Sequence, residues 1–556
     1  MFVRIKSTPN SPRKSVQLVE SFRQDGKARQ RVVRHIGIAN DDDELQRLRE
    51  LGEYVKAKLE ADAQPALFPA EDLAQLAIEA RHRDAARDEQ PLRVDLKKLR
   101  EEQRVVTGVH EVLGAIYREL GFARLMGARR KAAERNLFHT VMGRLANPRS
   151  KRATVSALEE DFGVHLHLQS VYRMMDAIDE KVVEKAKRLA TAAAKDLLGG
   201  PVQLLFYDCT TLYFESFTED ELKKNGYSKD MKFNQPQVML GLLATEEGLP
   251  LDYEVYPGNQ FEGKTLETAV NHVRQSYDLK AVVFTADSAL LSQDNLALLD
   301  KLEAPYIIGA RLKSLPEAWK RRVLDTDAYE AGEGGLAYQR FREWDYGGGR
   351  RLIVTYSQER AAKDRRDREK AVTKLRAKIA RSQKPESLIR NYGYKRFLRI
   401  EGDSKIVLDE RKLAQAARWD GLHGVITSAK ELTAGEAIEQ YRKLWQIEDC
   451  FRVAKHDLRI RPIFHWTPSR VRAHLLICFL ALVCLRSLAY RVRLRFEAMS
   501  PERIIRALNS VQTSLLRDTS NQRRYVLPSR ISEDARKLYI TLGLKPDTTP
   551  YEIRQN

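Results

Sequence analysis

Apolar and polar positions change their periodicity along the chain, and each change marks a predicted region. Within residues 1–40, the runs KSVQLVESFR and ARQRVVRHIG alternate with the period of a strand. They flank the turn-forming pair Asp25-Gly26, which predicts a β-hairpin. From 41 to 198, beginning with DDDELQRLRELGEYVKAKLEA, apolar residues recur at helical spacing, so this region is expected to be mainly helical.

A β-rich pattern begins at 199 and continues to 314. Three strand-like runs come first, then the helical pattern KTLETAVNHVRQSYDL, and then the strand-like runs KAVVFTADSALLS and PYIIGARLK. With a second helix between the last two runs, the succession β-β-β-α-β-α-β predicts an α/β sheet with an antiparallel half. The first three strands are expected in VQLLFYDCTTLYFES and QVMLGLLATEEGLPLDYEVYPGN.

Residues 315–430 interrupt this pattern and are expected to form a β-rich insertion domain. Short strand-like runs surround a highly charged helix, whose narrow apolar stripe is formed by Val372, Leu375 and Ile379. Such a stripe predicts packing on one side only.

The last region, 431–556, is expected to be helical. It begins with one long helix, AGEAIEQYRKLWQIEDCFRVAKHDL. The most apolar run, LLICFLALVCL, is too short to span a membrane and ends at Arg486, so it predicts a buried helix and no membrane partner.

The charge balance indicates a polyanionic partner. The net charge is +19, and the excess is concentrated in the windows 1–40, 128–152 and 360–384. Clustered Lys and Arg gain free energy by displacing counterions from phosphates. Solvated basic faces explain any one window equally well, but explain all three less readily.

The cysteine and histidine patterns argue against zinc. The 4 cysteines form no CxxC pair, which favours a reduced compartment. His35, His423 and His465 have no metal-binding spacing, so core or surface roles are expected for them. No apolar segment follows the basic N-terminus, so a cytoplasmic location is expected.

Three acids stand where a divalent cation could be bound. Asp208 lies within the apolar run LLFYDCTTLYF, where an ionised carboxylate is costly to bury unless it is paired or bound to a cation. Asp287 closes the strand VVFTAD, and open α/β sheets bind ligands at such strand ends. Glu448 lies on a later helix, in YRKLWQIEDCFRVAK. Their oxygens are ligands that Mg²⁺ prefers.

Each acid alone also has a purely structural explanation. A strand Asp is often hydrogen-bonded within the fold, an Asp that ends a strand often caps a turn, and a helical Glu is often solvated. Only the combination of all three acids with a basic chain and this strand order favours a metal site.

The order of Asp208, Asp287 and Glu448 resembles that of the DDE transposases of bacterial insertion sequences. It is most similar to the insertion-sequence-four-like class, in which a motif runs Tyr, two residues, Arg, three residues, Glu, six residues, Lys. Tyr441, Glu448 and Lys455 fit these spacings, whereas Leu444 occupies the Arg position. The runs GYSKD, QVMLGLL, GLP, PGNQFEGKT, FVRIKSTPNSPRKSVQLVES and RPIFHWTPSRVRAHLLICFLAL are similar to a branch of large transposases.

The resemblance implies a fold and a reaction. The fold is α/β, with a ribonuclease-H-like mixed sheet core, the β-rich insertion domain and a mainly helical N-terminal region. The reaction is cleavage of DNA at transposon ends and strand transfer into target DNA, with two Mg²⁺ ions roughly 4 Å apart and Mn²⁺ able to replace them. Asp208 would bridge the ions, and Asp287 and Glu448 would each hold one.

The resemblance also implies DNA contacts. Tyr441 and Lys455 are expected to contact phosphates near the cleavage point. We expect Arg452, one helical turn beyond Glu448, to replace the missing arginine. Arg311 and Lys313, in GARLK, follow a core strand and could reach DNA, although surface salt bridges explain them equally well.

The expected partners are double-stranded DNA, comprising terminal inverted repeats and target DNA, and a second copy of the chain on that DNA, associated with a bacterial nucleoid. Two alternatives remain: a ribonuclease-H-like nuclease that cuts without joining, and a non-catalytic DNA-binding protein descended from a transposase. A strand-transfer assay with pre-cut ends would separate the first, and the presence of all three acids argues against the second.

Overall fold

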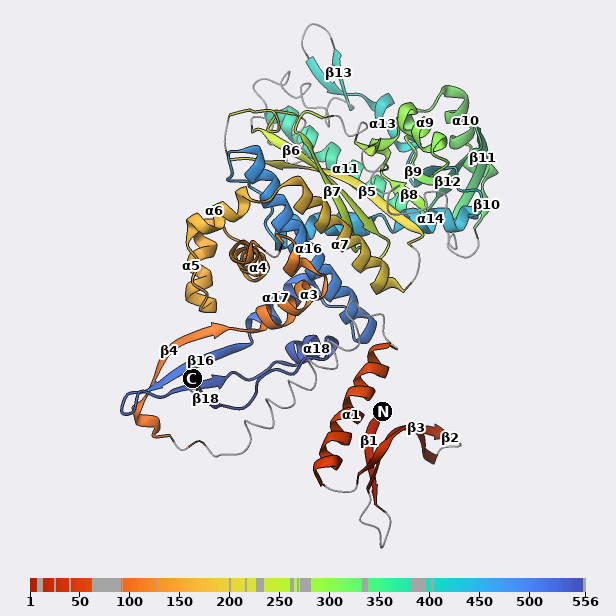
Figure 1. The fold of residues 1–556 in the computed structure, drawn as a ribbon. Coiled ribbons are helices and arrows are strands. Elements are labelled where there is room, and N and C mark those ends of the chain that lie inside the picture. The colour runs from red at the N-terminus through yellow and green to blue at the C-terminus, as the bar shows by residue number, and fades with distance from the viewer. Residues whose placement is uncertain are drawn as a thin grey trace. The chain divides into compact units, whose positions relative to one another are not determined.

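The computed structural model describes most of the chain, in two compact units (Figure 1). Unit 1 comprises Met1–Pro201, Leu249–Asp252 and Arg452–Asn556, and unit 2 comprises Val202–Gly248 and Tyr253–Phe451. The N-terminal and C-terminal regions therefore fold together, and all three acids belong to unit 2. The described residues are 1–7, 14–24, 27–39, 42–62, 92, 94–127, 129–199, 202–215, 218–226, 235–260, 265–267, 270, 282–332, 339–381, 397–401 and 405–553.

A nine-stranded sheet organises unit 2, in the order β10-β11-β12-β15-β9-β8-β5-β6-β7. The central strand β5 runs antiparallel to β6 and parallel to β8, and β8 runs parallel to β9. A central first strand with an antiparallel neighbour on one side and parallel neighbours on the other is the order of a ribonuclease-H-like sheet. The predicted α/β class with an antiparallel half is confirmed. The core strands are β5 (Leu204–Tyr213), β6 (Gln237–Thr245), β7 (Pro250–Pro257), β8 (Val283–Ala286) and β9 (Tyr306–Gly309), with helix α9 (Gln293–Lys301) between β8 and β9.

Strands from the predicted insertion extend this sheet and do not form a separate β-domain. β12 pairs with β15, which in turn pairs with β9, and this pairing buries Leu352, Ile353 and Val354. The β-rich insertion predicted at 315–430 therefore contributes strands that continue the core sheet within unit 2. The added elements are α10 (Glu317–Leu324), β10 (Glu330–Ala331), β11 (Arg340–Gly347), β12 (Arg350–Tyr356) and β15 (Leu422–Thr427).

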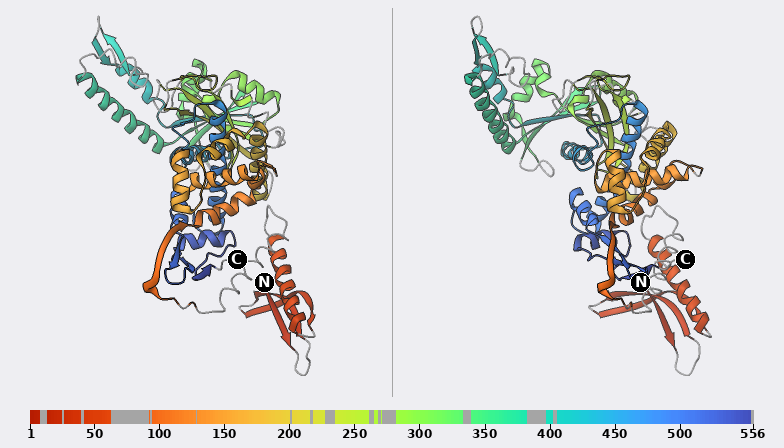
Figure 2. Two further views of the ribbon diagram at one scale, coloured as in Figure 1. Left: turned by 60° about the vertical axis from the view of Figure 1, so that its left-hand side comes forward. Right: turned by 90° about the vertical axis from the view of Figure 1, so that its left-hand side faces the viewer.

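The rest of the insertion forms a smaller layer around the basic helix α11 (Gln358–Arg381), which Figure 2 shows beside a two-stranded hairpin. Leu375 of α11 is fully buried, and Ile379 packs on the same cluster with Phe397 and Leu398. The predicted packing of this helix on one side is confirmed. The accompanying elements are β13 (Leu398–Glu401), β14 (Lys405–Leu408) and α13 (Glu410–Ala417).

The N-terminal part of unit 1 is a three-stranded antiparallel sheet. β2 (Lys14–Gln24) and β3 (Lys27–Ala39) form the predicted hairpin, and β1 (Phe2–Ser7) adds a strand that the pattern did not indicate. The predicted turn at Asp25-Gly26, like most of the helix expected in KTLETAVNHVRQSYDL, lies outside the described residues. Helix α1 (Asp42–Asp62) follows the hairpin.

Helix α16 (Pro468–Arg495) forms the core of unit 1, where it packs on α3, α4, α6 and α7. Among the described helices it is the one long and apolar enough to cross a membrane, and 78% of its most apolar stretch is buried within the protein. The prediction of a buried helix is confirmed. The neighbouring helices are α3 (Gly114–Glu119), α4 (Lys131–Ala146), α5 (Lys151–Phe162), α6 (Leu168–Asp176), α7 (Glu180–Leu198), α17 (Pro501–Asn509) and α18 (Glu533–Thr541).

A four-stranded sheet in unit 1 adds strands to the regions that were predicted to be mainly helical, 41–198, and helical, 431–556. Its order is β18-β17-β16-β4, so the early strand β4 pairs with β16 from the far end of the chain. Neither strand is buried enough to show a clear apolar alternation, which is why the pattern did not indicate them. The strands are β4 (Leu99–Val106), β16 (Gln512–Asp518), β17 (Arg524–Pro528) and β18 (Tyr551–Ile553).

An ion pair between α16 and α3 provides a test of this core. Nη1 of Arg491 donates to the Glu119 carboxylate at 2.8 Å, and both side chains are less than one-fifth exposed. Arg491→Leu should lower the free energy of unfolding by about 3 kcal/mol, because the Glu119 carboxylate stays desolvated without its partner. The thermal unfolding midpoint measures the loss.

The double variant Arg491→Leu/Glu119→Leu is the control, because it removes both charges from the buried site. It should recover most of the lost stability. If the double variant is as unstable as Arg491→Leu alone, then lost packing and not the orphaned carboxylate explains the effect.

Candidate active site

Strand β5 carries Asp208 at the centre of the sheet. Residues on either side of it are buried, whereas Asp208 itself is half-buried. It lies opposite Leu242 of β6, and its neighbour Tyr207 lies opposite Ala286 of β8. The parallel register therefore places Asp208 level with the residue that follows Ala286.

That residue is Asp287, which directly follows the end of β8 and is exposed to solvent. Its Oδ1 accepts a hydrogen bond of 2.5 Å from the backbone N–H of Ser288, capping a short 3₁₀ turn. Because neighbouring strands are about 4.8 Å apart, Asp208, in the middle of β5, lies beside Asp287 at the carboxyl end of β8. Ligands bind at this edge in open α/β sheets.

Glu448 lies exposed in the first turn of helix α15 (Trp445–Arg452). The single long helix predicted here is two helices, since α14 (Ala434–Arg442) ends before α15 begins. The break falls at Lys443 and Leu444, where the N–H groups of both residues bond to carbonyls three positions earlier. Nζ of Lys443 also forms an ion pair with Oε2 of Glu246 at a distance of 2.7 Å.

The phenol of Tyr441, at the end of α14, is the group whose pKa all three acids influence. Burial, reinforced by the negative charges of Asp287, Glu448 and Asp208, raises the pKa of the Tyr441 phenol well above its usual range. The phenol packs directly on the end of β9, because a Cβ at Gly309 would overlap the Tyr441 hydroxyl. The charges of all three acids that the sequence singled out therefore act on one half-buried phenol.

Two residues near Tyr441 were not predicted as site residues. His423 of β15 has its ring centroid 5.2 Å from that of Tyr441, although a core or surface role was expected for it. Burial and the nearby Arg360 and Arg442 lower the pKa of His423 to about 4, so its ring is neutral near pH 7. Gly309 could have been suspected, because a glycine at a strand end often marks a close approach of other groups.

Leu444 departs from the resembling motif for a structural reason. Its side chain is only 7% exposed, so it faces the interior, where a guanidinium would lose its hydration. The neighbouring Trp445 is 55% exposed.

Arg452 and Lys455 follow Glu448 along the chain but belong to unit 1. Nη1 of Arg452 lies 3.3 Å from Oδ2 of Asp457, so this guanidinium has a carboxylate partner. Lys455 lies in a π-helical turn, Val453–Asp457, directly after α15. The wider turn changes the residue spacing, so regular α-helical spacing does not extend from Glu448 to Lys455. Phosphate contacts by both residues stay predictions.

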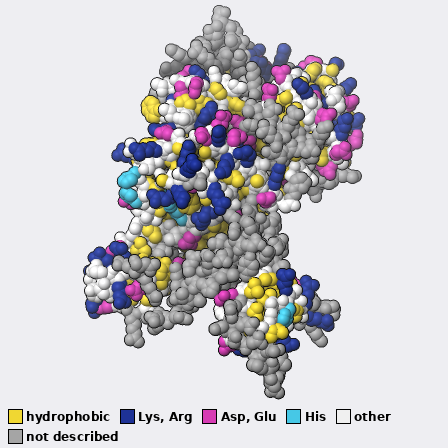
Figure 3. Space-filling view, in the orientation of Figure 1, with side chains coloured by type: hydrophobic (Ala, Val, Ile, Leu, Met, Phe, Trp, Pro, Cys, Tyr) yellow, Lys and Arg dark blue, Asp and Glu magenta, His cyan; other side chains and the backbone are white. Residues whose placement is uncertain are grey.

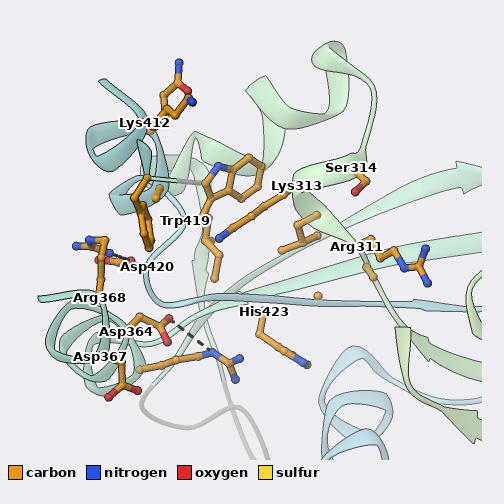
Figure 4. A pocket seen from close by; sticks show the side chains of 18 residues that line it. Arg311, Lys313, Ser314, Asp364, Asp367, Arg368, Lys412, Trp419, Asp420 and His423 are labelled. Atoms are coloured by element: carbon orange, nitrogen blue, oxygen red, sulfur yellow. Dashed lines mark hydrogen bonds and ion pairs between the residues drawn. The ribbon is translucent and has the colours of Figure 1, made fainter. Parts of the chain in front are cut away.

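Arg311 and Lys313 line a cavity of about 780 Å³ within unit 2 (Figure 4). Lys313 points toward Trp419, whereas the Arg311 guanidinium donates to the carbonyl oxygen of Ala289 at 3.1 Å. His423 connects the cavity with the region of the acids, because it lines the cavity and its ring also packs against that of Tyr441. Further charged residues around it are Arg360, Asp364, Asp367, Arg368, Lys412 and Asp420.

The donor atoms at the sheet edge fit Mg²⁺, although no complete metal cage is formed. Within the described ranges, no group of three or more His, Cys, Asp and Glu side chains lies close enough to hold a metal ion. Mg²⁺ is commonly bound by one or two carboxylates together with waters and substrate phosphates. Asp208, Asp287 and Glu448 supply oxygen donors of that kind, with phosphate oxygens left to the substrate.

The cysteines near the acids serve packing. The thiol of Cys209 lies 3.3 Å from Oγ1 of Thr265, and the thiol of Cys450 lies 3.4 Å from the carbonyl oxygen of Gly248. Both cysteines are buried.

Comparison with known proteins adds two family matches. A model described as the transposase DDE domain matches residues 202–484, a span that contains all three acids, and a model of the N-terminal domain of IS1634 family transposases matches residues 3–66. No curated protein matches the chain.

Among solved structures, the chain is similar to piggyBac transposase in a synaptic complex with hairpin DNA. The identity is 10% and the TM-score 0.39, over 72% of this chain and 76% of that one. It is also similar to Mos1 transposase in a pre-cleavage transpososome, with 13% identity and a TM-score of 0.14, over 32% of this chain and 57% of that one.

The burial of Leu444 can be tested directly. Leu444→Arg should lower the free energy of unfolding by about 3 kcal/mol, because it forces a charge into an apolar position. Trp445→Arg is the matched control: the same charge enters at the adjacent, exposed position and should be tolerated. Equal thermal midpoints for the two variants would contradict the burial of Leu444.

Proposed function

This chain belongs to the DDE transposases, and on that premise we propose that Asp208, Asp287 and Glu448 are the carboxylates with which it works. Its activity is DNA transposition, the cleavage of DNA strands and their transfer to a new site. The assignment is supported by the charges of all three acids, which act on the Tyr441 phenol, and by the parallel pairing of β5 with β8, which sets Asp208 beside Asp287.

Enzymes of this family use divalent metal ions, and we assign two Mg²⁺ ions to these carboxylates, with Mn²⁺ as a substitute. Asp208 would contact both ions, while Asp287 and Glu448 would each hold one. When bound, such ions activate the attacking oxygen and stabilise the leaving oxygen of phosphoryl transfer.

The residues around the acids would bind and orient the strand. The Tyr441 phenol keeps its proton near pH 7, because burial and three nearby acids raise its pKa, so it can donate a hydrogen bond to a phosphate oxygen. His423 is neutral at the same pH and adds no charge beside it. Lys313, in the adjoining cavity, supplies a cation for the phosphate of a neighbouring nucleotide.

The substrate DNA consists of terminal inverted repeats and a target duplex, and two copies of the chain act together on it. The dimer follows from the reaction, since two transposon ends must be brought together. The clustered basic segments support DNA binding beyond the active site. The setting is the nucleoid of a bacterial cytoplasm.

Substitution of the acids tests the assignment. Each single substitution should reduce the rate of strand cleavage by about 1,000-fold or more: Asp208→Asn, Asp287→Asn and Glu448→Gln. The residues of one catalytic unit act together, so that losing one of them costs nearly as much rate as losing all. Cleavage is measured on duplexes that carry the element's ends, with Mg²⁺, with Mn²⁺ and with EDTA. Retained DNA affinity in each variant excludes misfolding as the cause.

Asp449→Asn is the matched control, because Asp449 neighbours Glu448 but is not assigned to metal. It should retain cleavage. Loss of cleavage with Asp449→Asn but not with Glu448→Gln would overturn the assignment of Glu448. Pre-cut ends test joining separately, and a protein that cuts but never joins such ends would be a nuclease.

Lys313→Gln tests the cavity as part of the DNA path. Loss of one phosphate contact should lower the dependence of log affinity on log salt concentration by about 0.9. Fluorescence anisotropy over a range of salt concentrations measures the slope. Lys301→Gln, on α9 and outside the cavity lining, is the control. An unchanged slope in Lys313→Gln would exclude the contact.

A further inference from the structure

Unit 1 contains a cavity of about 290 Å³ that is surrounded by positive charge. No Asp or Glu stands among its lining residues as far as the chain is described. Figure 3 shows Lys and Arg side chains gathered over the helices of unit 1. The cationic lining residues come from α4, from the start of α5 and from the segment before α16: Arg144, Arg149, Lys151, Arg152, Arg459 and Arg461.

Two of these cations are almost completely buried. Arg144 and Lys151 are each 4% exposed. Nη1 of Arg144 donates to the carbonyl oxygens of Leu458 and Arg459 at 3.3 Å. Nζ of Lys151 lies 3.2 Å from Nδ1 of His474. These acceptors are all uncharged, and among the described residues none supplies a carboxylate to Arg144 or Lys151 at this place.

The hydrogen-bond pattern fixes His474 as a neutral acceptor. Nε2 of His474 lies 2.9 Å from the carbonyl oxygen of Ile460 and therefore carries the proton, which leaves Nδ1 to accept from Lys151. Burial, together with Arg144, lowers the pKa of Lys151 to about 7. Burial and the neighbouring cations also lower the pKa of His465 to about 3. An anion in the cavity would relieve this repulsion.

The backbone is also arranged for an anion. The first turn of α5 lines the cavity, and the dipole at a helix N-terminus attracts negative charge. The backbone of Arg459 has a φ of 45°, which residues other than Gly rarely adopt. Strained backbone of this kind occurs preferentially at ligand sites.

Aromatic side chains stand at the cavity, as expected for a site that binds a nucleotide and not a small ion alone. Phe464 lines the cavity and is 58% exposed. Tyr172 also lines it, with its ring 6.4 Å from that of His465. An exposed aromatic face next to a cationic pocket lets a base stack while its phosphate is bound.

We propose that this cavity binds a backbone phosphate of a DNA strand, with Phe464 against the adjacent base. Arg149 and Arg152, exposed at the start of α5, would make the outer contacts, and Lys151 would make the buried one. The site lies in a different unit from the acids. The proposal rests on the chain acting on DNA, but not on the catalytic roles of Asp208, Asp287 and Glu448.

The test compares Arg149→Gln/Arg152→Gln with a control that loses an exposed arginine outside the cavity, Arg173→Gln on α6. Binding of a short labelled oligonucleotide to the full chain is measured by anisotropy over a range of salt concentrations. The double variant should lose about tenfold in affinity. The slope of its log affinity against log salt concentration should fall by the amount that corresponds to about two phosphate contacts. Lys151→Met and Phe464→Ala should each weaken binding as well, with circular dichroism to verify folding.

An affinity and salt dependence equal to those of Arg173→Gln would overturn the proposal. Inorganic phosphate provides the second arm. If it displaces the oligonucleotide only at far higher concentration, a nucleic-acid phosphate is the ligand; equal potency per phosphate would mean a site for a free anion and would overturn the assignment to DNA. Cleavage by Asp208→Asn tests the catalytic assignment in a separate assay, so failure of that assignment and failure of the phosphate site remain distinguishable.

Discussion

The parallel pairing of β5 with β8 is the constraint on which the candidate active site depends. It sets Asp208 and Asp287 at one level, so that two carboxylates from positions far apart in sequence share one sheet edge. Continuing the same register to β9 brings Gly309 to that level, and the missing side chain there admits the Tyr441 phenol. A slip of one residue would turn Asp208 to the opposite face of the sheet.

Unit 1 depends instead on the burial of one long helix. α16 is apolar around nearly its whole circumference, so helices from both ends of the chain must cover it. This requirement joins the N-terminal and C-terminal regions in one unit, and it also holds His474 in the floor of the basic cavity. Packing and the proposed phosphate site therefore rest on the same helix.

Much of this arrangement was predictable from the sequence, because strong periodicity reflects burial. The strands around Asp208 and Asp287, the hairpin of β2 and β3, and the buried α16 all have clear apolar patterns. β4 and β16 were missed because their partners lie far apart in sequence and their faces are only half-buried. The break between α14 and α15 was missed because Lys443 and Leu444 are ordinary helix residues, and a tertiary ion pair with Glu246 accompanies the break. His423 was missed because a histidine in a strand gives no sign of its neighbours.

The close contact between Gly309 and Tyr441 has a consequence for sequence change in this enzyme. Any side chain at 309 would occupy the space of the phenol hydroxyl. The two positions, separated by the whole insertion, can therefore vary only together. A relative with a larger residue at the position of Gly309 should have a residue other than tyrosine at the position of Tyr441. Such a relative would need another group to bind a phosphate oxygen beside its acids.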